Sequence, residues 1–243
     1  MLFLSGLVLE LNYPKVTDYK SFILKRLKRI YPVYIACFFF SLIYFLISTS
    51  FSCQACNLKN FILGISGFQA FFGEWGGPIL RTGWFIGLII CLYLLFPLIS
   101  NLIKKKPYLI LLLTFIISFF SRLLLGKYDL LPNRALDWFP LSRLFEFSLG
   151  IYAANIIPKT FWQIADKLQM LSGSIFFLSE ISFPLFLIHY PLLNLIKKFI
   201  NMGLSPAFSV IFYLSISFVA SWTINFLTDK YYYRKLAFNT KEK

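Results

Sequence analysis

The sequence predicts an all-helical fold, a polytopic bundle of transmembrane helices. The mean hydropathy is +0.72, and 58% of the 243 residues are hydrophobic against 14% charged. That composition leaves too little polar surface for a water-soluble domain of this size. Apolar runs long enough to cross a bilayer core of ~30 Å alternate with short, mostly basic interruptions. We therefore expect one membrane-embedded domain over residues 1–243.

The first elements surround a basic segment. Residues 1–11 form an apolar run that is too short to cross a membrane alone. Residues 13–30 form a basic loop, which we place on the cytoplasmic side. Within it, residues 21–30 have the apolar spacing of a short amphipathic helix on the membrane surface. Pro32 then fits the first turn of a long helix over 31–51.

The remaining apolar runs predict further membrane segments. They lie at 59–73, 83–103, 107–125, 140–157, 174–198 and 206–227. The run at 59–73 is short and contains Gly64 and Gly67, so we expect a re-entrant arm there. The basic loop and the basic tail, residues 229–243, should share the cytoplasmic side. An even number of crossings must then separate them, and six remain when 59–73 does not cross.

Charge and cysteine content exclude other classes of function. The net charge is +14, and the basic residues lie beside the apolar spans, where they anchor the topology. Nucleic acid is therefore not an expected partner. Cys37 and Cys91 lie in apolar runs and are interpreted as small core residues. Cys53 and Cys56 have no second Cys or His pair, which favours a disulfide or no bond at all. The sequence predicts no metal site.

A few polar side chains interrupt the apolar runs. They are Arg122, Arg143, Glu146 and His189, and ionisable groups at membrane depth are candidate functional residues. Arg143 and Glu146 are three residues apart, so they can form an ion pair on one helix face. Arg122 is expected to extend toward Lys127 and is assigned no ligand.

Five segments together resemble one family, the integral-membrane acyltransferases of acyltransferase family three. They are FLSGL at 3–7, KRLKRIYP at 25–32, WFI at 84–86 with YLLFPL at 93–98, RLFEFSLG at 143–150 and ISFPLFLIHYP at 181–191. Each segment is weak alone, but five in family order are specific. Members carry, in a helix before the first segment, a histidine presumed to be the catalytic base. The resemblance therefore implies an N-terminally truncated and internally shortened member.

The resemblance implies a membrane O-acyltransferase. It would transfer an acyl group, expected to be acetyl, from acyl-CoA to a carbohydrate hydroxyl of a surface polysaccharide or glycoconjugate. The expected partners are the lipid bilayer, acyl-CoA and the carbohydrate acceptor, with no bound cofactor. The expected location is a bacterial cytoplasmic (inner) membrane. Arg26 and Arg29, three apart on a helix, would bind the phosphates of acyl-CoA; the alternative is topology anchoring alone.

The other expected site residues have structural alternatives. Arg143 and Glu146 either support the helix bundle or line the acyl-transfer cavity. Trp84 and Tyr93 are also cavity candidates, although a separation of nine residues puts them on opposite sides of a helix; Trp84 also suits a position at the membrane interface. His189 is the single histidine, so it is the candidate base. The favoured alternative is a histidine hydrogen-bonded at a helix end.

Two other functions remain as alternatives to an acyltransferase. The first is a non-catalytic accessory or degenerate protein of polysaccharide assembly or export. The second is a transporter whose charged groups line a substrate path. The transporter ranks last because the sequence lacks the paired broken helices of an inverted repeat.

Overall fold

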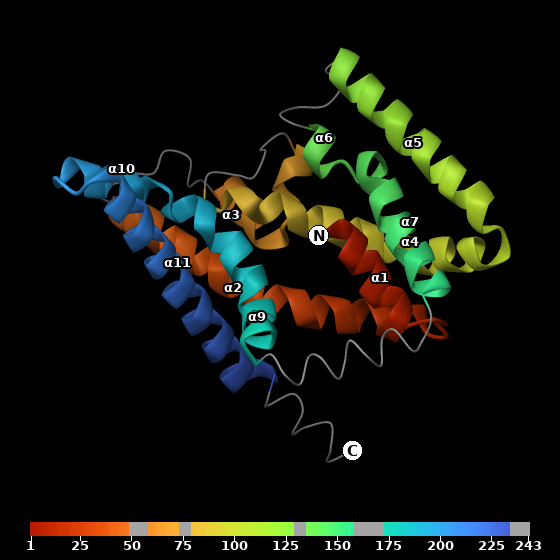
Figure 1. Cartoon of the computed structure of the whole chain (residues 1–243), viewed down its shortest axis with the longest axis horizontal. Coiled ribbons are helices and arrows are strands. Elements are labelled where there is room, and N and C mark those ends of the chain that lie inside the picture. The colour runs from red at the N-terminus through yellow and green to blue at the C-terminus, as the bar shows by residue number, and fades with distance from the viewer. Residues whose placement is uncertain (49–57, 73–78, 129–134, 158–172, 234–243) are drawn as a thin grey trace. The chain divides into compact units, whose positions relative to one another are not determined.

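The computed structural model describes residues 1–48, 58–72, 79–128, 135–157 and 173–233, and the regular elements among them are helices (Figure 1). The α-helices are α1 (Leu2–Asn12), α2 (Tyr19–Ser48), α3 (Leu58–Ser66), α4 (Trp84–Lys105), α5 (Pro107–Tyr128), α6 (Ala135–Trp138), α7 (Leu144–Ile156), α9 (Gly173–Leu192), α10 (Asn194–Asn201) and α11 (Pro206–Thr228). The shorter turns are η1 (Gln69–Phe72), η2 (Arg81–Gly83), η3 (Pro140–Arg143) and the π-turn η4 (Asp229–Tyr233). The Cys53 and Cys56 pair lies outside these residues.

The helices confirm the predicted membrane fold. In the part of the chain that the structure describes, four segments are long and apolar enough to cross a bilayer: Tyr19–Ser48, Arg81–Lys105, Pro107–Lys127 and Pro206–Tyr232. A fifth crossing is formed if α9 and α10 act as one span, with a bend of 49° between them. Pro191 precedes that bend, and proline is a usual cause of such kinks. The chain is thus an integral membrane protein.

We expected a surface helix at 21–30 that is separate from a span over 31–51, and this prediction was wrong. Residues 19–48 form one continuous helix of 30 residues, with Pro32 inside it and not in its first turn. Proline removes one backbone hydrogen bond, but membrane helices tolerate this because neighbouring groups and small local adjustments satisfy the freed carbonyl. The amphipathic stretch 21–30 therefore continues directly into the apolar run.

Two other expected segments are short helices. α3 has nine residues, about 13 Å, which agrees with an arm that does not cross. The span expected at 140–157 was wrong: η3 leads into α7, whose 13 residues measure about 20 Å. Pro140 starts η3 after an extended Phe139, which delays the α-helix to Leu144. The described helices therefore provide four or five candidate crossings and not the expected six.

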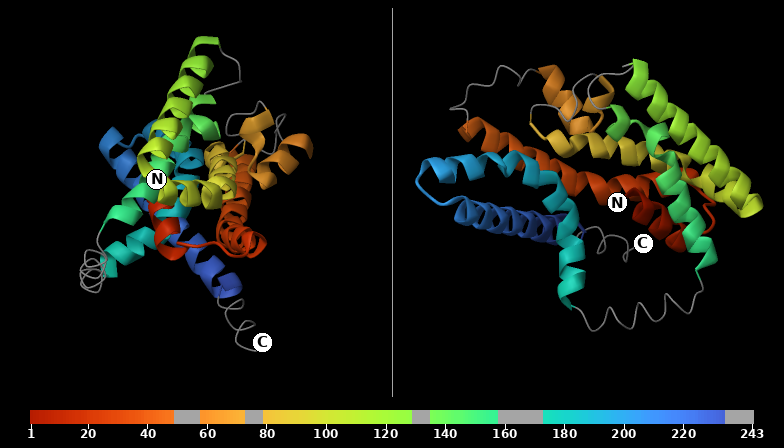
Figure 2. Two further views of the ribbon diagram at one scale, coloured as in Figure 1. Left: turned by 90° about the vertical axis from the view of Figure 1, so that its right-hand side faces the viewer. Right: turned by 45° about the horizontal axis from the view of Figure 1, so that its top comes forward.

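The described elements group into two compact units. Unit 1 comprises Met1–Lys28, Gly67–Trp75 and Trp84–Lys167; unit 2 comprises Arg29–Ser66, Gly76–Gly83 and Leu168–Lys243. In unit 1, α7 packs on α1, α4 and α5. In unit 2, α11 packs on α9 and α10, and the right-hand view of Figure 2 shows α11 returning beside them. α2 starts in unit 1 and continues in unit 2.

Glycines bring α1 and α7 into backbone contact in unit 1 (Figure 1). A Cβ added to Gly6 would collide with the carbonyl oxygen of Phe147. A Cβ added to Gly150 would collide with the carbonyl oxygen of Phe3 and lie 2.9 Å from the nitrogen of Leu7. Small residues allow such close approach between helices in a membrane, where dispersion contacts drive association. These two glycines therefore determine how α1 docks.

Tyrosine hydroxyls hold α3 against α2 in unit 2. Tyr31 donates to the carbonyl of Ser66 at 2.8 Å, and the fully buried Tyr34 donates to the carbonyl of Gly64. The last carbonyls of a helix have no partner within the helix, so these hydroxyls satisfy groups that would otherwise be unpaired. The short arm is thus attached by its C-terminal end.

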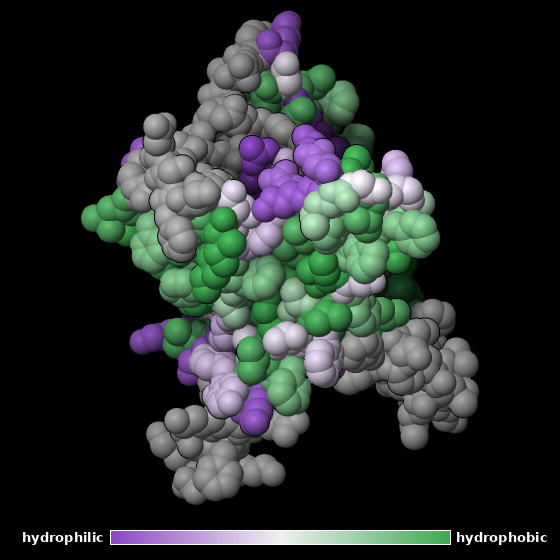
Figure 3. Space-filling model, turned by 90° about the vertical axis from the view of Figure 1, so that its left-hand side faces the viewer, coloured by the Kyte–Doolittle hydropathy of each residue, from purple (hydrophilic) through white to green (hydrophobic). Residues whose placement is uncertain are grey.

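Much of the described surface is apolar. Large hydrophobic side chains along α5 and α11 are exposed, among them Leu112, Phe120, Ile211 and Val219. Figure 3 shows hydrophobic side chains over broad areas of one face. Such a surface would aggregate in water and is suited to lipid. The exposed hydrophobic side chains of these two helices are therefore suited to contact with the acyl chains of a bilayer.

Candidate functional site

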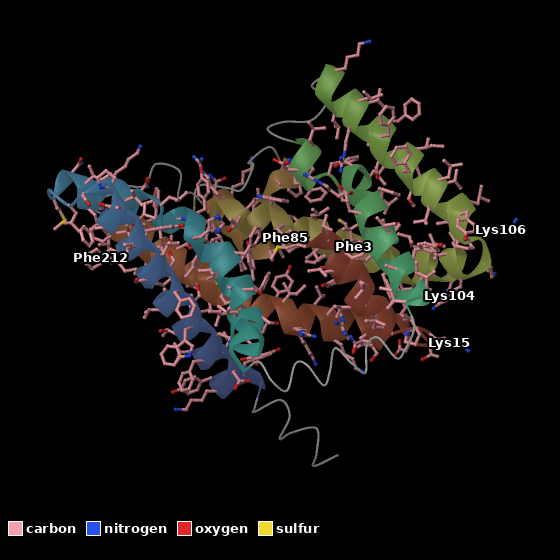
Figure 4. All side chains as sticks on the ribbon, in the orientation of Figure 1. Phe3, Lys15, Phe85, Lys104, Lys106 and Phe212 are labelled. Atoms are coloured by element: carbon pink, nitrogen blue, oxygen red, sulfur yellow. The ribbon has the colours of Figure 1, made fainter. Side chains whose placement is uncertain are left out.

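Lys104 lies at one end of unit 1 and connects α4 to the end of α1. Its Nζ lies 2.6 Å from Oε1 of Glu10 and 3.1 Å from the hydroxyl of Ser100, and it donates to the carbonyl of Pro14. Figure 4 labels Lys104 at the same end of the unit as Lys15 and Lys106. Glu10 is only 3% exposed, and sequence reasoning missed it although an acid in the apolar run 1–11 was a signal. We call the region of Glu10, Pro14, Lys15, Ser100, Lys104 and Lys106 the lysine end.

We expect Lys104→Met to destabilise the protein more than Glu10→Gln does. Removal of the lysine leaves a buried carboxylate without its partner, and breaking a buried pair costs about 3 kcal/mol or more. Removal of the acid leaves a lysine whose side chain is 32% exposed and can turn to solvent. Thermal unfolding of the detergent-solubilised protein measures both. Lys105→Met is the control, and an equal loss there would contradict the interpretation.

Arg26 lies on aromatic rings close to this end. Its guanidinium carbon is 4.3 Å from the centre of the Tyr13 ring and 5.8 Å from that of Phe22. Phe22 in turn stacks on Phe96 of α4, with centroids 5.4 Å apart. Arg26 is 9% exposed, and its Nε has no hydrogen-bond partner among the described residues. The expected arginine pair thus contains a buried member, Arg26, and an exposed member, Arg29.

Four charged side chains form a network at the start of α7. Arg122 of α5 pairs with Oε1 of Glu146 and donates from Nε to the carbonyl of Ser142 at 2.8 Å. Arg143 lies 3.5 Å from the same Oε1 and 3.1 Å from Oδ1 of Asp137. We call Arg122, Asp137, Arg143 and Glu146 the charge network. Its two cations and two anions alternate, and its formal charge is zero.

The network confirms one expected contact and corrects another. Arg143 and Glu146 form the ion pair that their spacing predicted. Arg122 was expected to extend toward Lys127, but it bonds to Glu146 and Ser142, because a guanidinium among apolar residues takes the carboxylate within reach. Asp137 was missed, since its contact with Arg143 depends on the path through η3. The link between helices is therefore Arg122 to Glu146.

Serine side chains support the backbone that carries this network. Ser118 of α5 donates to the carbonyl of Leu141 at 2.9 Å and accepts from the nitrogen of Phe145 at 3.0 Å. The buried Ser142 bonds to the carbonyls of Leu136 and Phe139. These bonds fix η3 and the first turn of α7 relative to α5. The charged groups are thus held on an ordered frame.

The two aromatic candidates of α4 lie in different surroundings. Trp84 is half-buried, packs against the cluster of Ala70, Leu125 and Trp138, and lies near the start of the candidate span Arg81–Lys105, so its expected place at the membrane interface stays a prediction. Phe71 lies 4.9 Å from Trp138 between ring centroids and extends the same cluster. Tyr93 is half-buried further along the helix. A role for either residue in a cavity stays a prediction.

His189 belongs to unit 2, close to the end of α9. Its Nδ1 lies 2.7 Å from the carbonyl of Phe186, which can only accept, so Nδ1 carries the proton. In the neutral ring, Nε2 then bears the lone pair. Tyr213 of α11 donates to the carbonyl of His189 at 3.1 Å. The favoured alternative, a hydrogen-bonded histidine near a helix end, agrees with this geometry.

Residues of η2 hold the same part of α9. The buried Thr82 donates to the carbonyl of Leu187 at 2.6 Å. Arg81 donates from Nη1 to the hydroxyl of Tyr190 at 2.7 Å, and its guanidinium lies 5.3 Å from the centre of that ring. The turn around His189 is therefore fixed from two elements, η2 and α11.

Within the described residues, no group of three or more His, Cys, Asp or Glu side chains is placed to hold a metal ion. Cys37 is buried and Cys91 half-buried, and both are free thiols, as expected for small core residues.

Comparison with known proteins gives one family. The sequence model of the acyltransferase 3 family, described as an acyltransferase domain, matches residues 1–172 of the 243. Four of the five segments that carry the resemblance lie inside this range, and the segment with His189 lies beyond it. Neither the curated proteins nor the solved structures gave a match.

Proposed function

The chain belongs to acyltransferase family three and is a membrane acyltransferase, and we propose that it transfers an acetyl group from acetyl-CoA to a carbohydrate hydroxyl. The acceptor is a surface polysaccharide or glycoconjugate, and the membrane is the bacterial cytoplasmic membrane. The donor is acyl-CoA, and the enzyme needs no bound cofactor. We also propose that nucleic acid is not among its partners.

The main structural support is the position of Arg26 at the lysine end. The guanidinium is fixed on Tyr13, and its Nε keeps an unused donor. Phosphate groups of acyl-CoA are natural partners for such a group, because guanidinium binds phosphate in a bidentate manner. Lys15, Lys104 and Lys106 add positive charge at this end (Figure 4), and Lys105 lies between the last two in the sequence. This charge concentrates anionic donors here. We assign this end to the cytoplasmic face.

The proposed chemistry needs one base. The acceptor hydroxyl oxygen attacks the thioester carbonyl and gives its proton to the base; the carbon–sulfur bond then breaks, and the thiolate of CoA leaves and takes up a proton. His189 is assigned as this base, with Nε2 as the accepting atom. The hydrogen bond from Nδ1 to Phe186, which also suits a structural histidine, fixes the ring and leaves the lone pair of Nε2 available for this role. Phe186 thus orients the base through its backbone.

An acetyl-transfer assay tests the proposal and its donor site. Membranes from cells expressing the chain should transfer labelled acetyl from acetyl-CoA to alkali-labile ester in carbohydrate, above membranes with empty vector. Arg26→Ala with Arg29→Ala should raise the KM for acetyl-CoA at least about 10-fold, since a hydrogen bond to a charged group contributes about 1.5–3 kcal/mol. The KM for acceptor should change little.

The matched control removes two charges from the same helix. Lys25→Ala with Lys28→Ala takes away exposed cations next to the arginines, and we expect the KM for acetyl-CoA to change less than about threefold. Arg26→Lys with Arg29→Lys should restore part of the affinity, because charge is kept but the bidentate fork is lost. If the arginine pair and the lysine pair change the KM for acetyl-CoA equally, Arg26 and Arg29 do not bind the donor and only anchor the topology. No incorporation by the unaltered chain would refute the function itself.

A further inference from the structure

Two atoms of the charge network lack hydrogen-bond partners. They are Oε2 of Glu146 and Nε of Arg143; both are buried, and neither has a partner among the described residues. Oε2 can only accept a hydrogen bond, and Nε–H can only donate one. Buried polar groups are nearly always paired in proteins, so an orphan acceptor and an orphan donor in one ion-paired cluster need an explanation. A ligand group that forms hydrogen bonds with both atoms would account for them.

We propose that the charge network binds a hydroxyl group of a neutral carbohydrate, the acceptor of the proposed acyl transfer. A hydroxyl is the group that fits, because it donates one hydrogen bond and accepts others. It would donate to Oε2 of Glu146 and accept from Nε–H of Arg143. The inference rests on the proposed function and identifies where the acceptor is held. Its residues are Arg122, Asp137, Arg143 and Glu146.

The charges of the network favour a neutral ligand. Each arginine already faces a carboxylate, and each carboxylate faces an arginine. A phosphate or carboxylate on the ligand would meet Asp137 and Glu146, and an ammonium would meet Arg122 and Arg143. Like charges placed together oppose binding, so either kind of charged group is rejected. A sugar hydroxyl encounters no such repulsion.

The network is also accessible by side-chain movement. Arg122 is 43% exposed and Glu146 34% exposed, although Oε2 itself is covered. Exposed side chains change rotamer on the ps–ns timescale, so the covered atoms can be uncovered without a change in the fold.

The position of Arg122 along α5 indicates that the charge network lies on the side of the membrane opposite the donor site. Arg122 is 16 residues beyond Lys106, a distance of about 24 Å along a helix. The helix is a candidate span, so its two ends face opposite sides of the membrane. The lysine end takes the donor in the proposed function. The charge network then lies toward the side where surface carbohydrate is found.

Saturation-transfer NMR on the full chain in detergent tests the inference without requiring activity. The probes are the methyl glycosides of glucose, galactose, mannose and N-acetylglucosamine, with glucose 6-phosphate and glucosamine as charged analogues. We expect saturation transfer to at least one neutral glycoside and at least about fivefold less to the charged analogues. Glu146→Gln should reduce the signal at least about fivefold, because it removes the carboxylate acceptor. The exposed Glu180→Gln should leave it unchanged.

A second variant guards against a folding defect. Arg143→Lys keeps the charge but removes Nε–H, and the same loss of signal is expected. Both variants are compared with the unaltered chain for unfolding temperature. No signal from any neutral glycoside, or equal signals from the unaltered chain and a folded variant, would overturn the inference. Glycoside binding without acetyl transfer would instead refute the proposed function and leave this site standing.

Discussion

His189→Asn is expected to lower the rate of acetyl transfer about 100-fold or more. General-base catalysis contributes roughly 10²–10⁴-fold, and asparagine cannot take up the proton of the attacking hydroxyl. Its side-chain amide can still donate to the carbonyl of Phe186, as Nδ1 does now. The end of α9 should therefore keep its conformation. The kcat measured at saturating acetyl-CoA reports the loss, and the KM for acetyl-CoA should stay within about twofold.

Two further measurements separate a base from a structural histidine. Added imidazole should restore part of the rate to His189→Gly, since a free imidazole can replace the missing base. Tyr213→Phe removes the hydrogen bond to the backbone of His189 but leaves the ring, and we expect a loss of less than about 10-fold. If His189→Asn keeps a rate within threefold of the unaltered chain, the residue serves only the helix end.

Gly150→Ala is expected to cost at least about 2 kcal/mol of unfolding free energy, and Gly150→Leu to give no folded protein. The added carbon meets the backbone of α1 at Phe3 and Leu7. Backbone atoms cannot rotate away as a side chain can, so α1 and α7 must separate along their contact. The change is followed by thermal unfolding in detergent and by the yield of monodisperse protein. Gly6→Ala should have a similar effect because its Cβ meets Phe147.

The matched control is the same substitution in α5. A Cβ at Gly126 meets nothing within 4 Å, so Gly126→Ala adds no contact and removes only backbone freedom. Alanine is favoured over glycine in a helix by about 1 kcal/mol, and the unfolding temperature should stay level or rise. If Gly150→Ala lowers the unfolding temperature and Gly126→Ala does not, the contact between α1 and α7 is the cause of the loss. A loss at Gly126 equal to that at Gly150 would refute it.

The helices that a single hydropathy run defines could be predicted from sequence. The expected spans 83–103, 107–125 and 206–227 correspond to α4, α5 and α11. The junction at Pro32 was predicted incorrectly, because proline is usually read as a helix start, whereas a membrane helix can contain it. α7 was predicted too long, because the apolar residues of η3 have the same hydropathy as a helix. Composition indicates burial in lipid but does not give the backbone conformation.

The candidate site was predictable only where its contacts are local. The pair Arg143 and Glu146 follows from a spacing of three residues. The partnership of Arg122 with Glu146 joins residues 24 apart on two helices, and periodicity carries no information on such contacts. Lys104 and Glu10 are separated still further, so the buried acid could not be given a partner. Tertiary packing decides these pairs.

The two neighbouring helices α4 and α5 have very different burial, with more than half of α4 inside the protein and less than a fifth of α5. Side chains of α5 meet fluid acyl chains, which adapt to any apolar shape. Those of α4 meet fixed neighbours. Relatives in other organisms should therefore exchange leucine, phenylalanine and isoleucine freely along α5 while keeping the volumes along α4, so the two helices should drift at unequal rates.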